Sequence, residues 1–377
     1  MKKFDVHVCL VSDQAVPNFV PVLDKDFRPG KVLLLVTEKM QAKADALAGA
    51  LKKRCPEVQV EKIALPSEYD MAGVEERLLE LLCDVENDQI ALNVTGGTKL
   101  MAIAAYGMFK EVGRSAFYFT ADSNEVLLLG AGDKERFTLQ PPKMKIEDYL
   151  ALHGYPAKAP LQKQVSHKTW LPFAQDLVRH TILAEGLPAL NYAISKAIKE
   201  KKEYVTVCDI PKSEEREQLL DLLEKHGLAE VDDGKLCFPD EDALRYVAGG
   251  WFEDYVFDIA KSLPGVQDIA INVQIVNAKA GIEAHNELDV VLLANNVLHV
   301  IECKTANFAK REEKAEDALY KLESLKKLGG LRTRAMFVSY HGLPSHSRDR
   351  ALSSQIDVIE KSNLTGMKTI MEKWIYG

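Results

Sequence analysis

The stretch Asn286-Glu-Leu-Asp-Val-Val-Leu-Leu-Ala-Asn-Asn-Val-Leu-His-Val-Ile-Glu-Cys-Lys304 decides the fold of the last third of the chain. Its two β-branched and aliphatic runs, 288–293 and 297–303, are typical of buried strands. The asparagine pair between them accepts the positive φ angles of a two-residue turn, so we expect a hairpin. In that register Asp289 lies directly opposite Glu302.

The two opposed carboxylates predict a cation site. Directly opposed side chains of a hairpin have Cβ atoms about 4.5–5.5 Å apart, so both carboxylates can bind one cation. Two bare carboxylates repel each other, and a hard divalent metal ion relieves that repulsion. Lys304 lies on the same strand face as Glu302, whereas Cys303 points toward the core. The alternative is a surface hairpin whose charges face water, but these charges interrupt apolar runs.

This arrangement, an Asp and then Glu-x-Lys across a hairpin, resembles the motif of the PD-(D/E)xK nuclease superfamily. The resemblance implies that Asp289, Glu302 and the backbone carbonyl of Cys303 bind Mg²⁺ or Mn²⁺. It also implies that Lys304 orients or activates the attacking water and offsets charge on the phosphate. Phosphodiester hydrolysis fits such a site, because a metal ion lowers the pKa of water and neutralises developing negative charge.

A preceding helix supplies one more candidate ligand. The segment Gly249-Gly-Trp-Phe-Glu-Asp-Tyr255 opens an expected helix over 250–262. A Glu in such a helix often completes the metal site in the family that the motif resembles, and Glu253 matches that position. The sequence departs from the literal Pro-Asp of the motif, because Glu-Leu-Asp stands at 287–289.

Composition sets the broad class of the protein. With 377 residues, 47% hydrophobic and 28% charged, the chain is expected to be soluble and globular, with two or three domains. It contains no apolar run of membrane-spanning length, and its start lacks the apolar region of a signal peptide, so we expect no membrane association. Six scattered cysteines without a Cys-x-x-Cys pair indicate reduced core residues of a cytoplasmic protein.

The net charge of −8 argues against a broad duplex-binding face. Basic residues do follow the metal motif closely, and they are either a local nucleic-acid surface or a solvated helix face with interleaved acids. They are Lys310, Arg311, Lys314, Lys321, Lys326, Lys327, Arg332 and Arg334.

The first third of the chain alternates strands and helices. Such alternation predicts an α/β domain with a mostly parallel, Rossmann-like sheet, whose ligands sit beyond the carboxyl ends of the strands. The expected strands are 4–11, 32–37, 58–64, 89–94, 115–120 and 126–129, and the expected helices are 38–54, 71–85 and 98–110.

Two polar turns occupy that edge: Ser12-Asp-Gln14 after the first strand, and Thr95-Gly-Gly-Thr-Lys99 after the fourth. In the second turn the glycines let backbone N–H groups approach an anion, and a helix N-terminus follows. The alternative is a tight structural turn in which the glycines serve packing and Thr98 caps the helix. The residues alone leave both interpretations open.

The segment Asn93-Val-Thr-Gly-Gly-Thr-Lys99, with the small-residue helix after it, resembles the signature of CARF domains, the CRISPR-associated Rossmann-like sensors. The resemblance implies a homodimer that binds cyclic oligoadenylate across its axis, with cyclic tetra-adenylate favoured. It assigns ligand contacts to this turn and to the turns after the first two strands. The candidates are Thr95, Gly96, Gly97, Thr98 and Lys99, then Ser12 and Gln14, and finally Thr37.

The middle of the chain predicts two helices (171–185 and 190–201), an amphipathic helix at 214–226 and a hairpin whose turn is Asp233-Gly234. This order resembles a winged helix. Acidic residues around the third helix argue against contact with duplex DNA, so a relay or dimerisation module is expected. We therefore divide the chain into a CARF-like sensor (1–145), a linker and winged-helix-like domain (146–245), and a restriction-endonuclease-like α/β domain (246–377).

In this order the parts resemble the Card/Can family of CRISPR ancillary nucleases. The resemblance implies a metal-dependent endonuclease of type III CRISPR antiviral defence, activated by cyclic oligoadenylate. Its substrate would be single-stranded DNA or RNA, with nicking of duplex DNA possible. The rival hypotheses are a nucleotide-sensing binding protein with an inactive nuclease domain, and a constitutive repair or restriction nuclease.

Overall fold

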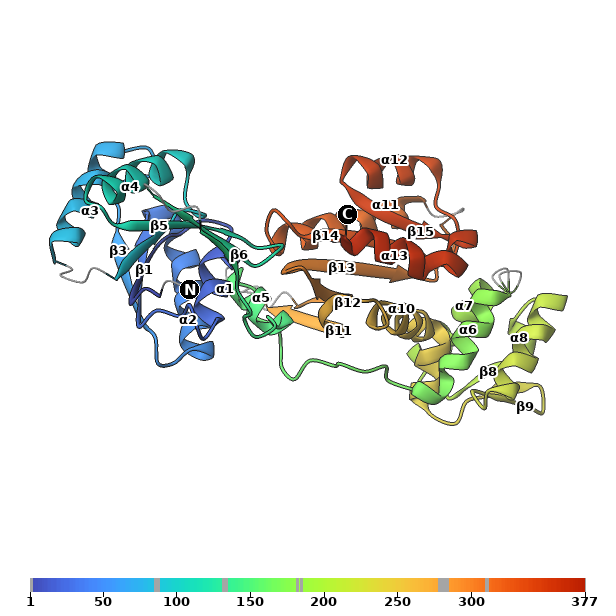
Figure 1. Cartoon of the computed structure of the whole chain (residues 1–377). Coiled ribbons are helices and arrows are strands. Elements are labelled where there is room, and N and C mark those ends of the chain that lie inside the picture. Colours follow the sequence, from blue (N-terminus) through green and yellow to red (C-terminus); the bar gives the residue numbers. More distant parts are fainter. Residues whose placement is uncertain are drawn as a thin grey trace.

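The computed structural model describes residues 3–84, 89–130, 135–180, 183, 186–276, 285–308 and 312–376. The molecule is elongated (Figure 1). An α/β part from the N-terminal third lies at one end, the C-terminal third lies in the centre, and the middle of the chain forms the opposite end. Within the described parts of the chain, every helix is too short or too polar to cross a lipid bilayer.

The N-terminal part is a seven-stranded sheet in the order β3-β2-β1-β4-β5-β6-β7, whose first five strands are parallel and whose last two are antiparallel. The predicted Rossmann-like α/β fold is therefore confirmed. The strands are β1 (Val6–Leu10), β2 (Lys31–Val36), β3 (Gln59–Ala64), β4 (Ile90–Asn93), β5 (Ser115–Thr120), β6 (Glu125–Leu129) and β7 (Arg136–Thr138).

Helices cover both faces of this sheet (Figure 1). α3 (Met71–Asp84) and α4 (Lys99–Glu111) pack together on one face, and α1 (Val16–Leu23) and α2 (Gln41–Arg54) lie on the other, after the short turn η1 (Glu38–Met40). The sequence analysis did not predict α1, which contains two prolines. Every residue of α1 is buried, so tertiary packing holds a helix that local propensity does not favour.

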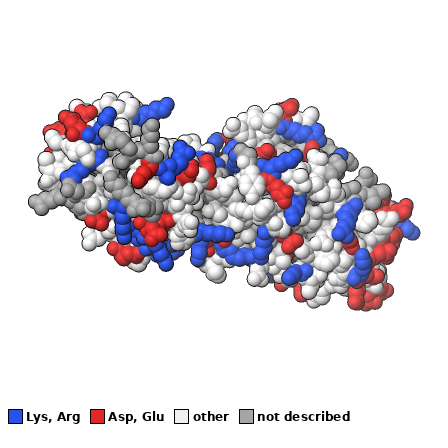
Figure 2. Space-filling model, viewed as in Figure 1, with Lys and Arg blue, Asp and Glu red and all other residues white. Residues whose placement is uncertain are grey.

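The middle part has the element order of a winged helix, as predicted. Its helices are α6 (Leu171–Arg179), α7 (Leu187–Lys199) and α8 (Glu214–Lys225), and its sheet has the order β8 (Tyr204–Thr206), β10 (Lys235–Cys237), β9 (Glu230–Asp232). Asp233 and Gly234 form the predicted hairpin turn, with φ angles of 42° and 70°. β8 was not predicted. Figure 2 shows acidic side chains gathered at the end that carries α8 and β9, whereas basic side chains spread along the middle of the molecule.

The C-terminal part is a five-stranded mixed sheet in the order β11-β12-β13-β14-β15, antiparallel across β11, β12 and β13 and parallel from β13 to β15. The strands are β11 (Val266–Val276), β12 (His285–Ala294), β13 (Val297–Lys304), β14 (Arg334–Ser339) and β15 (Ile356–Glu360). The helices are α9 (Glu241–Arg245), the π-helical turn η5 (Tyr246–Gly250), α10 (Trp251–Lys261), α11 (Glu312–Leu328), α12 (Ser345–Ser353), the turn η8 (Lys361–Gly366) and α13 (Met367–Tyr376).

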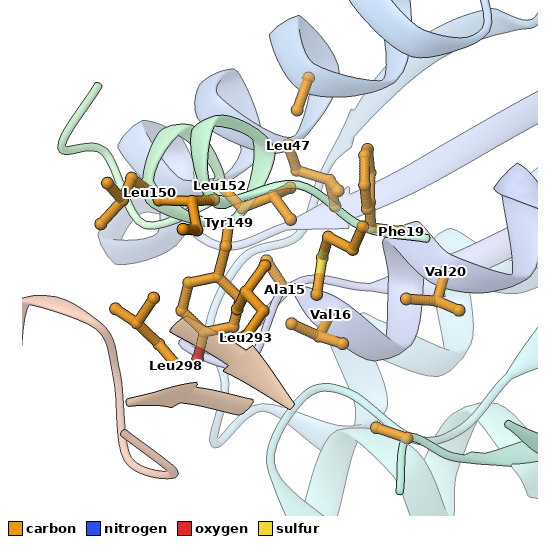
Figure 3. Packing of buried hydrophobic residues seen from close by; sticks show 14 of the residues in the cluster. Ala15, Val16, Phe19, Val20, Leu47, Tyr149, Leu150, Leu152, Leu293 and Leu298 are labelled. Atoms are coloured by element: carbon orange, nitrogen blue, oxygen red, sulfur yellow. The ribbon is translucent and has the colours of Figure 1, made fainter. Parts of the chain in front are cut away.

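One hydrophobic core joins the N-terminal and C-terminal parts. The short helix α5 (Ile146–Leu152) lies between them, and Figure 3 shows Tyr149 close to the hairpin residues Leu293 and Leu298, with Val16 of α1 nearby. These side chains belong to a single buried cluster. The two parts therefore share buried apolar surface and are not merely tethered by a linker.

Candidate functional site

The hairpin of β12 and β13, which carries Asp289 and Glu302, has the predicted register. The ladder between β12 and β13 runs from Ala294 opposite Val297 to Val290 opposite Ile301, so Asp289 and Glu302 occupy the next positions beyond its last pair. The turn residues Asn295 and Asn296 have φ angles of 51° and 57°, the left-handed values that asparagine tolerates.

Three oxygen atoms surround one cationic group at the open end of this hairpin. The Lys304 ammonium lies 2.6 Å from Glu302 Oε1, 3.3 Å from Asp289 Oδ2 and 3.0 Å from the carbonyl oxygen of Cys303. Asp289 Oδ2 also accepts a hydrogen bond of 2.8 Å from the Cys303 backbone N–H. Both carboxylates are buried, and the thiol of Cys303 is buried on the opposite strand face, as predicted.

The electrostatics of this group follow from that burial. Burial alone lowers the pKa of Lys304, but the charges of Asp289 and Glu302 outweigh it and hold the pKa above its ordinary value. Burial, and then the charge of Asp289, raise the pKa of Glu253 to about 8. Glu253 lies in the first turn of α10, which packs against β12 and β13. The charges of the hairpin therefore act on the Glu253 carboxyl from the neighbouring strands.

The oxygen set suits a hard divalent cation. Carboxylate and carbonyl oxygens are the ligands of Mg²⁺ and Mn²⁺, and Asp289, Glu302 and the Cys303 carbonyl already converge on one positive charge. Glu302 Oε2 is buried and has no hydrogen-bond partner among the described residues, so one oxygen is free to accept a ligand. Among the described residues, no three His, Cys, Asp or Glu side chains are close enough together to bind one metal ion. Glu253 is therefore not positioned as a third side-chain ligand beside Asp289 and Glu302 in this structure.

Two further side chains reach this site. Lys321 of α11 lies with its Nζ 3.4 Å from Glu302 Oε1, although the sequence analysis placed it in a basic cluster without a role of its own. Ser339 is paired with Lys304 in the parallel ladder of β13 and β14. Its hydroxyl is buried without a partner in the described parts of the chain. Neither could be found from spacing, because α11 and β14 meet the hairpin only through the tertiary fold.

Most of the basic cluster makes contacts within the protein. Lys326 donates to the Ser354 and Gln355 carbonyl oxygens, Lys327 pairs with Glu323, Arg332 pairs with Asp122, and Arg334 donates to the Trp374 carbonyl oxygen. Lys310 and Arg311 lie outside the described residues. The cluster is therefore not one continuous free surface.

The turn after β4 is held by a buried polar network. Asn93 Nδ2 donates to the Pro17 carbonyl oxygen at 2.9 Å and to Asn18 Oδ1 at 3.0 Å. Thr95 Oγ1 donates to Asn93 Oδ1 at 2.7 Å and accepts from the Phe119 backbone N–H at 2.8 Å. Asn93 and Thr95 thus have structural partners, and α1 supplies several of them.

The glycines of this turn are consistent with both a tight structural turn and an anion-binding site. A Cβ on Gly96 would lie 2.1 Å from the Leu10 carbonyl oxygen, and Gly97 has a φ of +76°, so close packing and a left-handed backbone explain both. Thr98 caps α4 by accepting from the Met101 N–H at 3.2 Å. However, no described residue accepts a hydrogen bond from the N–H of Gly96 or Gly97. The Gly97 N–H remains available to an anion at the start of a 13-residue helix, whereas Gly96 is buried.

A cavity of about 340 Å³ opens above the two polar turns, and we call it the turn cavity. Its lining includes six of the eight residues proposed as ligand contacts: Ser12, Gln14, Thr37, Thr95, Gly97 and Thr98. Gly96 and Lys99 do not line it. Gly96 is buried beneath the turn, and Lys99 is exposed at the start of α4.

The cavity also has lining residues that the sequence analysis did not select. Lys39 pairs with Glu68 at 2.5 Å, and its ammonium lies 5.7 Å from the centre of the Tyr69 ring. Leu331 joins them from the segment between α11 and β14. Lys39 and Glu68 follow β2 and β3 at the carboxyl edge of the parallel sheet, so that edge was the signal that could have identified them.

Comparison with known proteins matches the N-terminal and C-terminal parts of the chain to two domain families. Residues 6–149 match the family model of the Card1 CARF domain, and residues 240–376 match that of the Card1-like endonuclease domain. The chain belongs to the Card1-like family of CARF-domain endonucleases. The resemblance to Card/Can nucleases that the sequence indicated is thereby confirmed. Among curated proteins the comparison finds no match.

Solved structures share the arrangement of this CARF-endonuclease chain. Protein VC1899 from Vibrio cholerae is 26% identical, with a TM-score of 0.88 and 98% of each chain covered. Can2 from Sulfobacillus thermosulfidooxidans, solved in complex with cyclic tetra-adenylate, is 28% identical, with a TM-score of 0.79 over 99% of this chain and 98% of that one. A type III CRISPR defence DNA nuclease activated by cyclic oligoadenylate is 20% identical, with a TM-score of 0.55 over 90% of this chain and 46% of that one. This last likeness shows the fold alone.

Replacing Gly96 by alanine tests the packing of the CARF turn. The new Cβ cannot fit against the Leu10 carbonyl, so the turn must shift, and overpacking of this kind costs about 1–3 kcal/mol. We expect Gly96→Ala to lower the midpoint of thermal unfolding, as measured by circular dichroism. The control Gly49→Ala lies in α2 with open space around it and gains up to about 1 kcal/mol of helix propensity. An unchanged midpoint for Gly96→Ala would contradict this description of the turn.

Proposed function

We propose that this protein is a homodimeric, metal-dependent endonuclease of type III CRISPR antiviral defence and that cyclic tetra-adenylate, a cyclic oligoadenylate, activates it. Its substrate is single-stranded DNA or RNA. The observation that carries the proposal is the convergence of Asp289, Glu302 and the Cys303 carbonyl on one cationic group in a Card1-like endonuclease domain.

Each residue of the hairpin has a distinct task in this proposal. Asp289, Glu302 and the Cys303 carbonyl hold Mg²⁺ or Mn²⁺, with Glu253 facing them from α10. The bound metal supplies a nucleophilic water and neutralises charge on the phosphate. Lys304 donates hydrogen bonds and places its positive charge beside the reacting phosphate. Lys321 adds a second positive charge beside the same Glu302 oxygen, Oε1.

The turn cavity supports the activator assignment. Its lining combines backbone N–H groups at a helix start, the hydroxyls of Ser12 and Thr37, and the ammonium of Lys39. Such groups bind phosphate and ribose. Can2, a neighbour of similar length and fold, is described in complex with cyclic tetra-adenylate.

The charge distribution supports a flexible, single-stranded substrate. The chain carries a net charge of −8, and acidic side chains gather at the winged-helix end in Figure 2. A rigid duplex that lies across this end meets repulsion, whereas a single strand can enter a local site beside Lys304 and Lys321.

Cleavage of labelled single-stranded DNA and RNA tests the proposal. We expect cutting only when Mn²⁺ or Mg²⁺ and cyclic tetra-adenylate are both present. Glu302→Ala removes a metal ligand and is expected to lower the rate at least about a hundredfold. Glu323→Ala, which removes a carboxylate of α11 that pairs with Lys327, serves as the matched control and keeps activity. Cutting without activator would favour a constitutive nuclease, and no cutting under any condition would favour a nucleotide-binding protein.

An apolar stripe on α4 supports the homodimer. Leu100 and Ile103 are 39% and 60% exposed, and Gly107 follows one turn later with open space around it. These positions share one face of the helix and begin directly after the turn cavity. A second copy of the chain would cover this stripe and bring two turn cavities together.

Changing this stripe tests the dimer. The variant Ile103→Asp places a charge in the centre of the proposed interface, so we expect it to be monomeric, at 42.0 kDa, whereas the wild type has twice this mass. Light scattering coupled to size-exclusion chromatography measures the mass. The control Tyr192→Asp alters a 71% exposed side chain of α7 and should stay dimeric. A dimeric Ile103→Asp would show that α4 is not the interface.

A further inference from the structure

The endonuclease domain contributes a side chain to the turn cavity of the CARF domain. Leu331, in the segment between α11 and β14, lines this cavity together with Ser12 and Gln14. It is 81% exposed, more than any other large hydrophobic side chain in the described parts of the protein. A single exposed leucine is ordinary on a protein surface, but this one borders a cavity that already carries polar ligand-binding groups.

A second exposed apolar group borders the same cavity. Tyr69 is 71% exposed, and its ring is part of the lining. Tyr69 belongs to the CARF domain, between β3 and α3, whereas Leu331 belongs to the endonuclease domain. The cavity therefore has exposed apolar surface from both domains, which suits the flat face of a purine base.

Contacts with the CARF side hold the Leu331 segment in place. The Tyr149 hydroxyl donates to the Gly329 carbonyl oxygen at 2.9 Å. Gly330 has a φ of +84°, and a Cβ there would lie 2.8 Å from His153 Nε2, so only glycine allows this close approach. Arg332 pairs with Asp122 in the turn between β5 and β6. Leu331 is thus anchored on both sides and is preorganised at the rim of the cavity.

We propose that Leu331 contacts an adenine base of the cyclic oligoadenylate in the turn cavity, so that one ligand touches the CARF and endonuclease domains of the same chain. The proposal rests on the proposed function and adds a ligand-contact residue that lies outside the CARF domain. The expected contact is apolar, because Leu331 offers no hydrogen-bonding side chain and its surface is uncovered without ligand.

This contact has a consequence for activation. A ligand shifts the arrangement of two domains only if its free energy of binding differs between the arrangements. A ligand that contacts Leu331 meets this condition directly. The Leu331 segment also follows α11, whose Lys321 pairs with the buried Glu302 of the cleavage site. The cavity and the cleavage site are therefore connected through one helix and its C-terminal loop.

Calorimetric titration of the full-length protein with cyclic tetra-adenylate tests the proposal. We expect Leu331→Ser to weaken binding roughly tenfold, because it removes apolar surface that the base would cover. Leu331→Met keeps an apolar side chain and should bind within about twofold of the wild type. The matched control is Leu352→Ser in α12 of the same domain, a leucine that is 78% exposed and does not line the turn cavity. Because Leu331 is exposed, its replacement should leave thermal unfolding unchanged.

The outcomes separate this inference from the proposed function. Weaker binding for Leu331→Ser, with Leu331→Met and Leu352→Ser near the wild type, supports the contact. Wild-type affinity for Leu331→Ser overturns the contact and leaves the activator assignment standing. Equal losses for Leu331→Ser and Leu352→Ser also overturn it, because the effect would then not be specific to the cavity. A wild-type protein that binds no cyclic tetra-adenylate overturns both.

Discussion

The register of the β12–β13 hairpin is the constraint on which the rest of the structure depends. The two-residue turn at Asn295 and Asn296 determines which side chains face each other along both strands. A slip of one residue would move every side chain to the other face of the sheet. Asp289 and Glu302 would then separate, and the apolar residues of the two core clusters, one on each face of the sheet, would exchange faces.

The same turn also fastens the hairpin to the CARF domain. Asn296 Nδ2 donates to the Ala121 carbonyl oxygen at 2.8 Å and to Asn124 Oδ1 at 2.9 Å. The hairpin thus has its turn in contact with the CARF domain and its acidic pair at the opposite end. A shared core around Tyr149 strengthens this connection.

Burial of charge explains why cationic side chains lie beside the hairpin carboxylates. Glu302 is 1% exposed, and a buried carboxylate is stable only with compensating charge or hydrogen bonds. Lys304 and Lys321 both approach Glu302 Oε1, while Oε2 has no partner among the described residues. The site therefore has capacity for one more positive group, and its oxygens are the kind that a divalent metal ion prefers.

The parts of this structure that could be predicted from sequence are those set by local rules. The hairpin register followed from the asparagine turn and the apolar runs, and the alternation of strands and helices predicted the parallel sheet. α1 was missed because Pro21 lies inside the helix and opposes it locally, and only burial of the whole segment overrides this. Lys321 and Leu331 were also missed as site residues. Their positions depend on where α11 lies against the hairpin and the CARF domain, and no spacing in the sequence encodes this.

Direct binding of Mn²⁺ tests the central claim that the hairpin carboxylates form a metal site. In an electron paramagnetic resonance titration of the full-length protein, we expect one bound Mn²⁺ per chain. Glu302→Gln should lose this site, because its amide cannot replace the charge of the carboxylate. Glu323→Gln, on the neighbouring α11, should retain it. Equal Mn²⁺ binding by the wild type and Glu302→Gln, or none by the wild type, would contradict the account.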